Sequence, residues 1–264
     1  MRGIFFSEFF GTFLMVLCGC GAIKLGFSPL VVSAVFGLSV TLAIISFRRF
    51  SGAHINPAVS IAFYLSGHVK SNQLIFYLSG QIFGGWLAAV IVGDYGATTL
   101  SVSSQLGIMI EIFITFVLMF SIYCIIRITD EDIPVAILVG LVVAILAFCF
   151  GTYTGASMNP ARTFGPNFVS GDIMVMPLYV ISTVIGAVIA ALIKNQIFAT
   201  DYAWVILALI LLIGAVIRHF FNTKHSGGAP PWWTWAVASV LALAAIVLSY
   251  IGAPPQGVDN KLSK

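Results

Sequence analysis

The sequence predicts an all-α membrane protein, with six transmembrane helices and two half-helices in an inverted repeat, followed by two additional C-terminal transmembrane helices. Three observations lead to this prediction. Only 8% of the 264 residues are charged and the mean hydropathy is +1.07, whereas soluble domains carry about 25% charged residues. Several apolar runs are long enough to cross a bilayer, which takes about 20 residues. A polar tripeptide, Asn-Pro-Ala, occurs twice in these apolar surroundings.

The apolar runs locate the expected transmembrane spans. The first run contains Glu8 and no strong cleavage site follows it, so we interpret it as a retained helix and not as a signal peptide. The expected spans lie near residues 3–24, 30–48, 73–93, 107–127, 133–151, 174–198, 202–221 and 232–252.

Basic residues indicate the orientation of the chain in the membrane. Arg48, Arg49, His68 and Lys70 lie on the connection after the second span, and Arg127 follows the fourth. The positive-inside rule places these connections, and with them the N-terminus, on the cytoplasmic side. The net charge of +3 is not gathered into a basic stripe, so we expect no nucleic-acid partner. The four cysteines fall inside apolar spans, where small residues allow close packing, and we expect no metal and no cofactor.

The chain contains an internal repeat. The stretch EFFGTFLMV (8–16) resembles EIFITFVLM (111–119), and an acid opens both. Glu8 precedes Asn56 by 48 residues, and Glu111 precedes Asn159 by 48 residues. Each repeat, about 1–98 and 105–199, therefore holds three spans. An odd number of spans inverts the second copy, and inverted repeats build sites near the membrane midplane from discontinuous helices.

A half-helix is expected after each tripeptide. The two copies are Asn56-Pro57-Ala58 and Asn159-Pro160-Ala161. Asparagine is a favoured N-cap and proline is favoured at the first helical position, so Asn-Pro reads as a helix start. Residues 57–65 and 160–169 would each extend about 15 Å, half of a hydrocarbon core about 30 Å thick. A single Asn-Pro is more often a surface turn, but two copies at equal register favour half-helices that enter from opposite membrane faces.

The stretches SGAHINPAV (51–59) and TGASMNPARTFGP (154–166) resemble the two signature loops of the aquaporin, or major intrinsic protein, family. The resemblance covers residues 1 to about 199. It implies an aquaporin-like hourglass with one pore per subunit, a homotetramer in the plasma membrane, and passive conduction of water or small neutral solutes without protons or ions. Asn56 and Asn159 would face each other and offer side-chain N–H groups to a passing oxygen.

Other polar residues in the repeats suggest further roles. Arg162 follows Asn159 by about one helical turn, and a charge there is costly unless it lines a wet cavity. We therefore expect Arg162 to be a fixed cation of the pore, since arginines and half-helix dipoles exclude protons and cations in aquaporin-type pores. The resemblance implies that Glu8 and Glu111 brace the Asn-Pro-Ala loops, with a proton relay as the alternative. His54 would line the pore or support its loop.

The resemblance also implies a narrow ring of four residues: Phe36, Ala147, Ala156 and Arg162. Water-selective members carry a histidine where Ala147 stands, and glycerol-conducting members carry a second aromatic residue where Ala156 stands. This sequence has neither. The ring is therefore predicted to be wider than a water-only filter, and glycerol, urea and metalloid hydroxides all remain open as solutes.

Two other readings remain. A secondary transporter would also show inverted repeats, but it would carry ion-coupling acids near the midplane beyond Glu8 and Glu111. A non-conducting junction or scaffold protein on the channel fold is the second alternative. No nucleophile with its base can be assembled from the spans, so we expect no enzyme. Residues 200–264 are predicted to form an accessory helical hairpin and tail outside the channel domain, 1–199.

Overall fold

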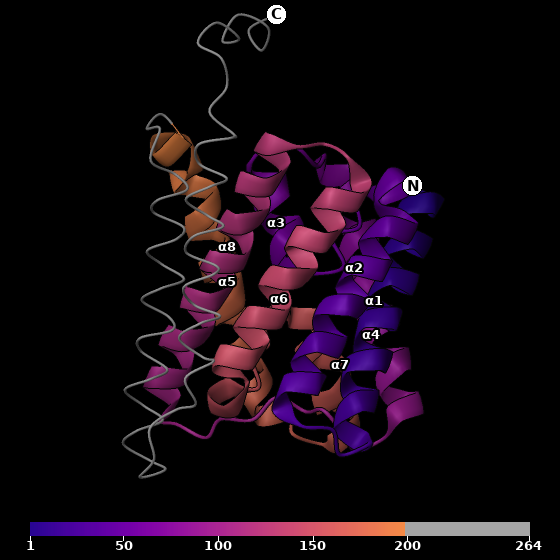
Figure 1. Ribbon diagram of the computed structural model, residues 1–264, viewed down its shortest axis with the longest axis vertical. Coiled ribbons are helices and arrows are strands. Elements are labelled where there is room, and N and C mark those ends of the chain that lie inside the picture. The colour runs from indigo at the N-terminus through magenta and orange to yellow at the C-terminus, as the bar shows by residue number, and fades with distance from the viewer. Residues whose placement is uncertain (199–264) are drawn as a thin grey trace, which may run out of the picture. The chain divides into compact units, whose positions relative to one another are not determined.

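A computed structural model of the chain describes residues 1–198. Long helices run along the bundle and two short helices, α3 and α7, lie toward its opposite ends (Figure 1). In chain order the elements are α1 (Arg2–Lys24), α2 (Pro29–Ser51), α3 (Pro57–Leu65), α4 (Ser71–Val92), α5 (Ser104–Ile128), α6 (Asp132–Thr154), α7 (Pro160–Ser170), the 3-10 turn η1 (Ile173–Val175) and α8 (Met176–Phe198).

The helices agree with the spans and half-helices that the sequence predicts within these residues. Within residues 1–198, six helices are long and apolar enough to cross a membrane. The first half-helix, α3, has the predicted bounds, and α7 is one residue longer than predicted because it ends at Ser170, before Gly171 in the left-handed conformation. The predicted spans near 202–221 and 232–252, and the hairpin they would form, lie outside the described residues.

Close helix contacts recur at equivalent positions of the two repeats. Gly37 on α2 and Gly140 on α6 face each other, and a Cβ on either would lie within about 2.5 Å of the other's carbonyl oxygen. Gly84 on α4 meets the carbonyl of Phe9 in the same way, and Gly186 on α8 meets that of Ile112. Small residues let membrane helices approach each other closely, so the repeat fixes helix packing as well as helix order.

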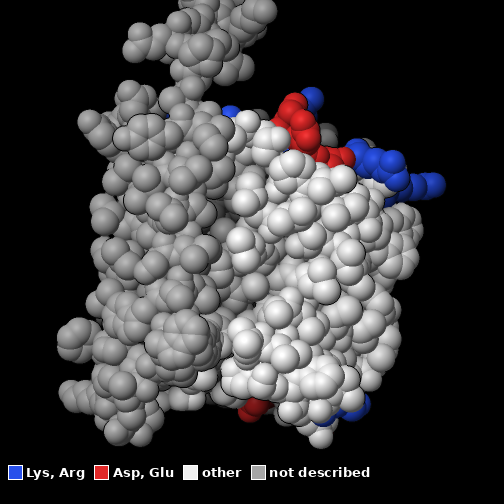
Figure 2. All heavy atoms as spheres, viewed as in Figure 1, with Lys and Arg blue, Asp and Glu red and all other residues white. Residues whose placement is uncertain are grey.

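Charged side chains mark the two ends of the bundle. We call the end that holds the N-terminus the N-side and the other end the far side. The visible face of the described residues is uncharged over its middle, and the charges lie at its ends (Figure 2). Of the Lys and Arg residues at the helix ends of this part of the chain, only Lys24 is on the far side. The N-side holds Arg2, Arg48, Arg49, Lys70, Arg127 and Lys194.

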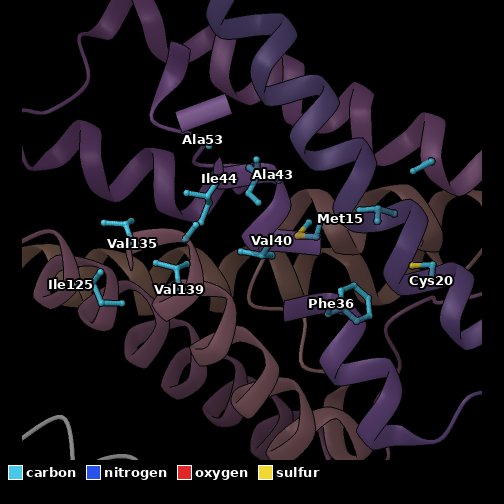
Figure 3. Close-up of a cluster of buried hydrophobic side chains, with 14 of the residues drawn as sticks. Met15, Cys20, Phe36, Val40, Ala43, Ile44, Ala53, Ile125, Val135 and Val139 are labelled. Carbon is cyan, nitrogen blue, oxygen red and sulfur yellow. The ribbon is translucent and has the colours of Figure 1, made fainter. Parts of the chain in front are cut away.

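A cluster of buried apolar side chains lies between α1, α2 and α6. Figure 3 shows members of this cluster from α1, such as Met15, beside members from α2 and α6, such as Val40 and Val139. Many of them also line an internal cavity. The apolar core of this part of the bundle is therefore also the wall of that cavity.

Candidate functional site

A cavity of about 430 Å³ runs along α2. Its lining residues on this helix form one stripe, on which all but the adjacent pair Val32 and Ser33 are three or four positions apart: Pro29, Val32, Ser33, Phe36, Val40, Ile44 and Arg48. At 1.5 Å per residue, the stripe from Pro29 to Arg48 is about 28 Å long. That length is close to the hydrocarbon thickness of a bilayer, about 30 Å. The cavity therefore extends over the depth of a membrane.

A second part of the wall comes from α6, at the equivalent positions of the second repeat. The lining residues there include Val135, Val139, Val143, Ala147 and Gly151. Under the repeat, Ala147 corresponds to Ile44 and Gly151 corresponds to Arg48. The inverted repeat thus produces two matching stretches of wall, with Arg48 at the N-side end of α2 and its counterpart Gly151 at the far-side end of α6.

The two half-helices begin next to each other inside the bundle. The Asn56 side-chain oxygen accepts a hydrogen bond from the Ala58 N–H at 2.9 Å. The Asn159 oxygen accepts from the N–H groups of Ala161 at 2.9 Å and Arg162 at 3.3 Å. Each asparagine is therefore the N-cap of its own half-helix, and its amide nitrogen points away from that helix.

The amide nitrogens connect the two loops crosswise. Asn56 Nδ2 donates to the carbonyl of Met158 at 2.7 Å, and Asn159 Nδ2 donates to the carbonyl of Ile55 at 2.8 Å. A side-chain amide has two N–H groups, so each nitrogen keeps a second one. The nearest further contact of Asn159 Nδ2 is the weak acceptor Met15 Sδ at 3.9 Å. Both asparagines line the cavity, which leaves two N–H donors available at its centre.

The loops before the half-helices adopt an unusual backbone. Ala53 and Ile55 have φ values of 49° and 46°, and the equivalent Ala156 and Met158 have 42° and 52°. A residue other than glycine in this region costs on the order of 1–3 kcal/mol and persists only where its surroundings enforce it. The same strained conformation occurs at equivalent positions of both loops, so it is a structural feature of the site.

Glu8 enforces the first loop. Its carboxylate is fully buried and accepts hydrogen bonds from the His54 N–H at 2.9 Å and the Ile55 N–H at 2.6 Å. The Ser51 hydroxyl and the Gln81 amide also donate to it, at 2.6 and 2.7 Å. The N–H groups of His54 and Ile55 lie in a loop and have no helical partner, and this one side chain accepts both.

Glu111 does the same for the second loop. It is also fully buried and accepts from the Ser157 N–H and the Met158 N–H, both at 2.9 Å. The Thr154 hydroxyl donates to it at 2.6 Å. Tyr179 donates to the Thr154 carbonyl at 2.6 Å, as Tyr77 does to the Ser51 carbonyl in the first repeat. Neither glutamate lines the cavity, so their position is that of braces behind the loops.

The four residues predicted to form a ring all line the cavity. The guanidinium carbon of Arg162 lies 5.0 Å from the centre of the Phe36 ring, and Arg162 is only 4% exposed. Its Nη1 donates to the carbonyl of Gly96 at 2.5 Å. Sequence reasoning missed Gly96, because nothing local in the chain connects residue 96 with residue 162.

His54 lies at the edge of the cavity and also supports its loop. The ring is stacked between Phe63 and Tyr77, with centroids 4.7 and 4.5 Å away, and its Nδ1 lies 3.1 Å from the Ser60 hydroxyl. The remaining residues of the tripeptides, Pro57, Ala58, Pro160 and Ala161, do not line the cavity. They begin the half-helices and are buried behind the asparagines.

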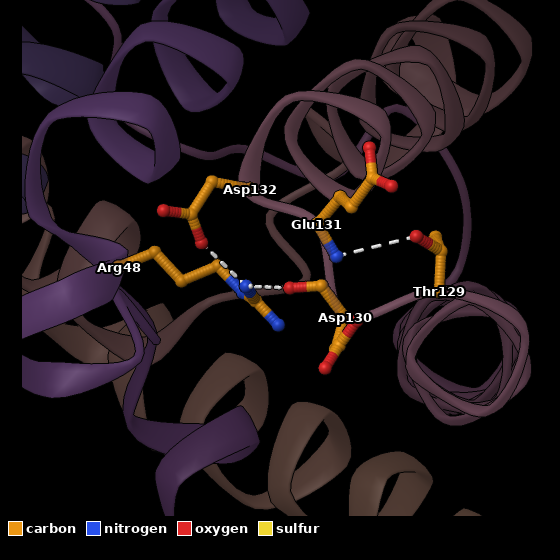
Figure 4. A network of polar contacts seen from close by, with 5 residues as sticks. All are labelled: Arg48, Thr129, Asp130, Glu131 and Asp132. Carbon is orange, nitrogen blue, oxygen red and sulfur yellow. Dashed lines mark hydrogen bonds and ion pairs between the residues drawn. The ribbon is translucent and has the colours of Figure 1, made fainter.

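An ion pair lies at the N-side end of the cavity. Arg48, which lines the cavity, contacts Asp132 Oδ1 at 2.5 Å and the Asp130 carbonyl at 2.6 Å. Figure 4 shows this arginine reaching from α2 to the turn between α5 and α6, where the Glu131 N–H donates to Thr129. The pair connects α2 with the start of α6, and no sequence pattern beyond the charges themselves indicated it.

A loop at the far side also enters the site. The connection between α4 and α5, residues 93–103, contributes Ala97, Thr99 and Ser101 to the cavity lining. Two hydroxyl-bearing residues therefore line the cavity from a segment that sequence reasoning left as a plain connection.

The fold and the site together define an integral membrane protein whose two re-entrant half-helices meet at a cavity of membrane depth. A family model described as Major intrinsic protein matches residues 2–194. The chain belongs to the major intrinsic protein family.

The comparisons with known proteins agree with this family. Aquaporin-4 from Mus musculus is 35% identical over 216 residues, which cover 74% of this chain and 67% of that protein. Aquaporin NIP3-1 from Arabidopsis thaliana is 38% identical over 209 residues, covering 70% of this chain and 64% of that protein. The X-ray structure of the aquaglyceroporin from Plasmodium falciparum shares the fold, with a TM-score of 0.67 at 22% identity, over 79% of this chain and 98% of that one.

A second family model, described as Urate oxidase N-terminal, matches residues 178–249. This match begins within α8, and most of it lies outside the described residues. It covers less than half of the chain and assigns no family. The relatives at 32–38% identity are aquaporins, which are channels and not enzymes.

Proposed function

We propose that the protein is a passive channel for water and small uncharged solutes that excludes protons and ions. The main support is the centre of the cavity, where Asn56 and Asn159 each keep one amide N–H after the crosswise bonds to the opposite loops. The oxygen of a passing water molecule accepts hydrogen bonds from these two donors. These bonds replace the ones that the molecule made in bulk water. Apolar walls from α2 and α6 hold the molecule in single file without binding it tightly.

The exclusion of cations follows from fixed positive potential. The N-termini of α3 and α7 both point at the centre of the cavity, and a helix N-terminus carries roughly half a positive charge. Arg162 adds a full charge near the far side. A cation would have to leave its hydration shell next to these charges, in surroundings that offer few acceptors. A neutral molecule meets no such barrier.

The width of the ring favours solutes larger than water. Ala147 and Ala156 contribute only methyl groups to the cavity lining, where Arg162 lies over the Phe36 ring. Thr99 and Ser101 add two hydroxyl-bearing side chains to the cavity lining. Small polyhydroxy or amide molecules fit such an opening, because one side of it is apolar and the other donates and accepts hydrogen bonds.

The orientation and assembly belong to the same proposal. The excess of Lys and Arg on the N-side favours a cytoplasmic N-terminus by the positive-inside rule. Membership of the family supports a homotetramer, with one pore in each subunit, in the plasma membrane. The ring of Phe36, Ala147, Ala156 and Arg162 would act as the selectivity filter, and Glu8, Glu111 and His54 as loop supports.

Reconstitution into liposomes tests the proposal. Stopped-flow light scattering would follow shrinkage under osmotic shock and re-swelling with glycerol, urea or arsenous acid. We expect faster water flow than in protein-free vesicles and measurable entry of at least one solute. A secondary transporter would instead require an ion gradient or show counterflow, and a scaffold protein would leave every rate at the protein-free value.

A further inference from the structure

The loop of residues 93–103 is held against the half-helix α7 by buried polar contacts that the channel centre does not use. Asn167, on α7, is fully buried. Its side-chain oxygen accepts from the Thr98 N–H at 2.9 Å and the Thr98 hydroxyl at 3.0 Å. Its nitrogen donates to the Thr98 carbonyl at 3.0 Å and to the Asp172 carbonyl at 3.3 Å. One asparagine thus binds the backbone of Thr98 on both sides, as a neighbouring strand would.

The same contacts reach the start of the half-helix. The Thr98 hydroxyl lies 3.1 Å from that of Thr163, which follows Arg162 directly. The Thr163 hydroxyl also contacts Ser157 in the loop braced by Glu111. Thr98, Thr163 and Asn167 are all 0% exposed, and buried hydrogen bonds of this kind resist rearrangement because an unpaired partner is costly.

Two residues before Thr98, the loop carries the carbonyl that anchors Arg162. Gly96 has φ of 86°, and a Cβ at this position would lie 2.4 Å from Cys20 Sγ. Only glycine adopts this backbone at such close approach to α1. The carbonyl of Gly96 is therefore held between α1 on one side and the contacts of Thr98 on the other, and it accepts from Arg162 Nη1.

We propose that Asn167 is a positioning residue for solute selectivity: through Thr98 it fixes the Gly96 carbonyl, and that carbonyl fixes the guanidinium of Arg162 at the narrow ring. The inference rests on the proposed channel function and names a determinant of its selectivity. Asn167 touches no solute, since it is absent from the cavity lining. Its effect passes through the buried Thr98 and the half-buried Gly96 to the one charged group of the ring.

Releasing this anchor should widen the ring for larger solutes more than for water. We expect Asn167→Ala to raise the ratio of glycerol to water permeability by about 2- to 10-fold, the change that one hydrogen bond is worth. Thr98→Val, which removes only the hydroxyl contacts, should act in the same direction with a smaller change. Thr98→Ser keeps these contacts and should behave as wild type. Ser170→Ala is the matched control for a local change at the end of α7, because the Ser170 hydroxyl donates to the Asn167 carbonyl and to Asp172 and does not contact the loop.

A second readout does not depend on conduction. Phenylglyoxal modifies arginine, and mass spectrometry would give the rate at Arg162 in the detergent-solubilised full chain. We expect a rate about 2- to 10-fold higher in Asn167→Ala than in wild type or Ser170→Ala. If Asn167→Ala does not fold, Thr98→Val decides both readouts.

The two proposals fail in different ways. A wild type without water permeability contradicts the channel function, while the labelling rates still decide whether Asn167 anchors Arg162. Equal labelling in Asn167→Ala and wild type overturns the inference. An unchanged permeability ratio in a conducting Asn167→Ala variant also overturns it, as does an equal change in Ser170→Ala, which would indicate a general effect on the end of α7.

Discussion

Replacement of either buried glutamate by glutamine should weaken the fold by a similar amount. The change keeps the size of the side chain and alters only one oxygen to an NH2 group. Glu8 accepts two backbone N–H groups, one on each carboxylate oxygen, and Glu111 accepts the N–H groups of Ser157 and Met158 in the same way. In either orientation of the new amide, one backbone N–H therefore faces an NH2 group and loses its acceptor.

The cost follows from that lost acceptor. A buried donor left without a partner costs about 1–3 kcal/mol, so Glu8→Gln and Glu111→Gln should each lower the free energy of unfolding by about that amount. Steric trapping in bicelles measures this free energy. Glu131→Gln is the matched control, since this acid lies at the N-side turn and its side chain braces no loop. Its unfolding free energy should remain within about 0.5 kcal/mol of wild type.

A functional effect should accompany the loss of stability. The loop residues whose N–H groups the glutamates hold, Ile55 and Met158, also provide the carbonyls that orient the amides of Asn159 and Asn56. Water permeability per folded channel should therefore fall in both variants. Glutamine variants that match Glu131→Gln in stability and conduct like wild type would refute the reasoning, because the N–H groups would then have other acceptors.

Three further predictions concern the ring, the centre and the extent of the channel. Ala147→His should lower glycerol permeability more than water permeability in the stopped-flow assay, because the larger side chain narrows the ring. An equal fractional decrease in the two permeabilities would contradict the width argument. Asn159→Asp should reduce water permeability about 10-fold or more, because a carboxylate oxygen would face the Ile55 carbonyl where the amide now donates. Truncation after residue 199 leaves the matched residues 2–194 intact, and water permeability per folded subunit should survive; a truncated protein that assembles but does not conduct would show that the C-terminal residues belong to the pore.

Local signals were sufficient for the half-helices. Asparagine followed by proline sets the N-cap and the first helical residue, and the structure places helix starts at Pro57 and Pro160. The spacing placed Glu8 and Glu111 at equivalent positions of the two repeats, and the family resemblance implied that each braces one loop; each carboxylate accepts a loop N–H group, that of His54 or that of Ser157. These features depend on short segments or on one constant offset, which a single sequence contains.

Contacts between distant segments could not be predicted in the same way. Arg162 is anchored by Gly96 and Asn167 holds Thr98, and these contacts join the half-helix α7 to the distant connection 93–103. The pair of Arg48 with Asp132 depends on how two antiparallel helices pack. Such contacts are set by tertiary packing of the bundle, and neither periodicity nor a motif reports them.

The most direct test of the central claim is the water permeability of a variant whose cavity is filled. Val40 lies midway along the α2 stripe and lines the cavity, and Val40→Trp would place an indole in the path. Stopped-flow shrinkage of proteoliposomes should be fast for wild type, with weak temperature dependence, and should fall to the protein-free rate for folded Val40→Trp. Wild-type vesicles that shrink no faster than protein-free vesicles, or a folded Val40→Trp that conducts like wild type, would contradict the account.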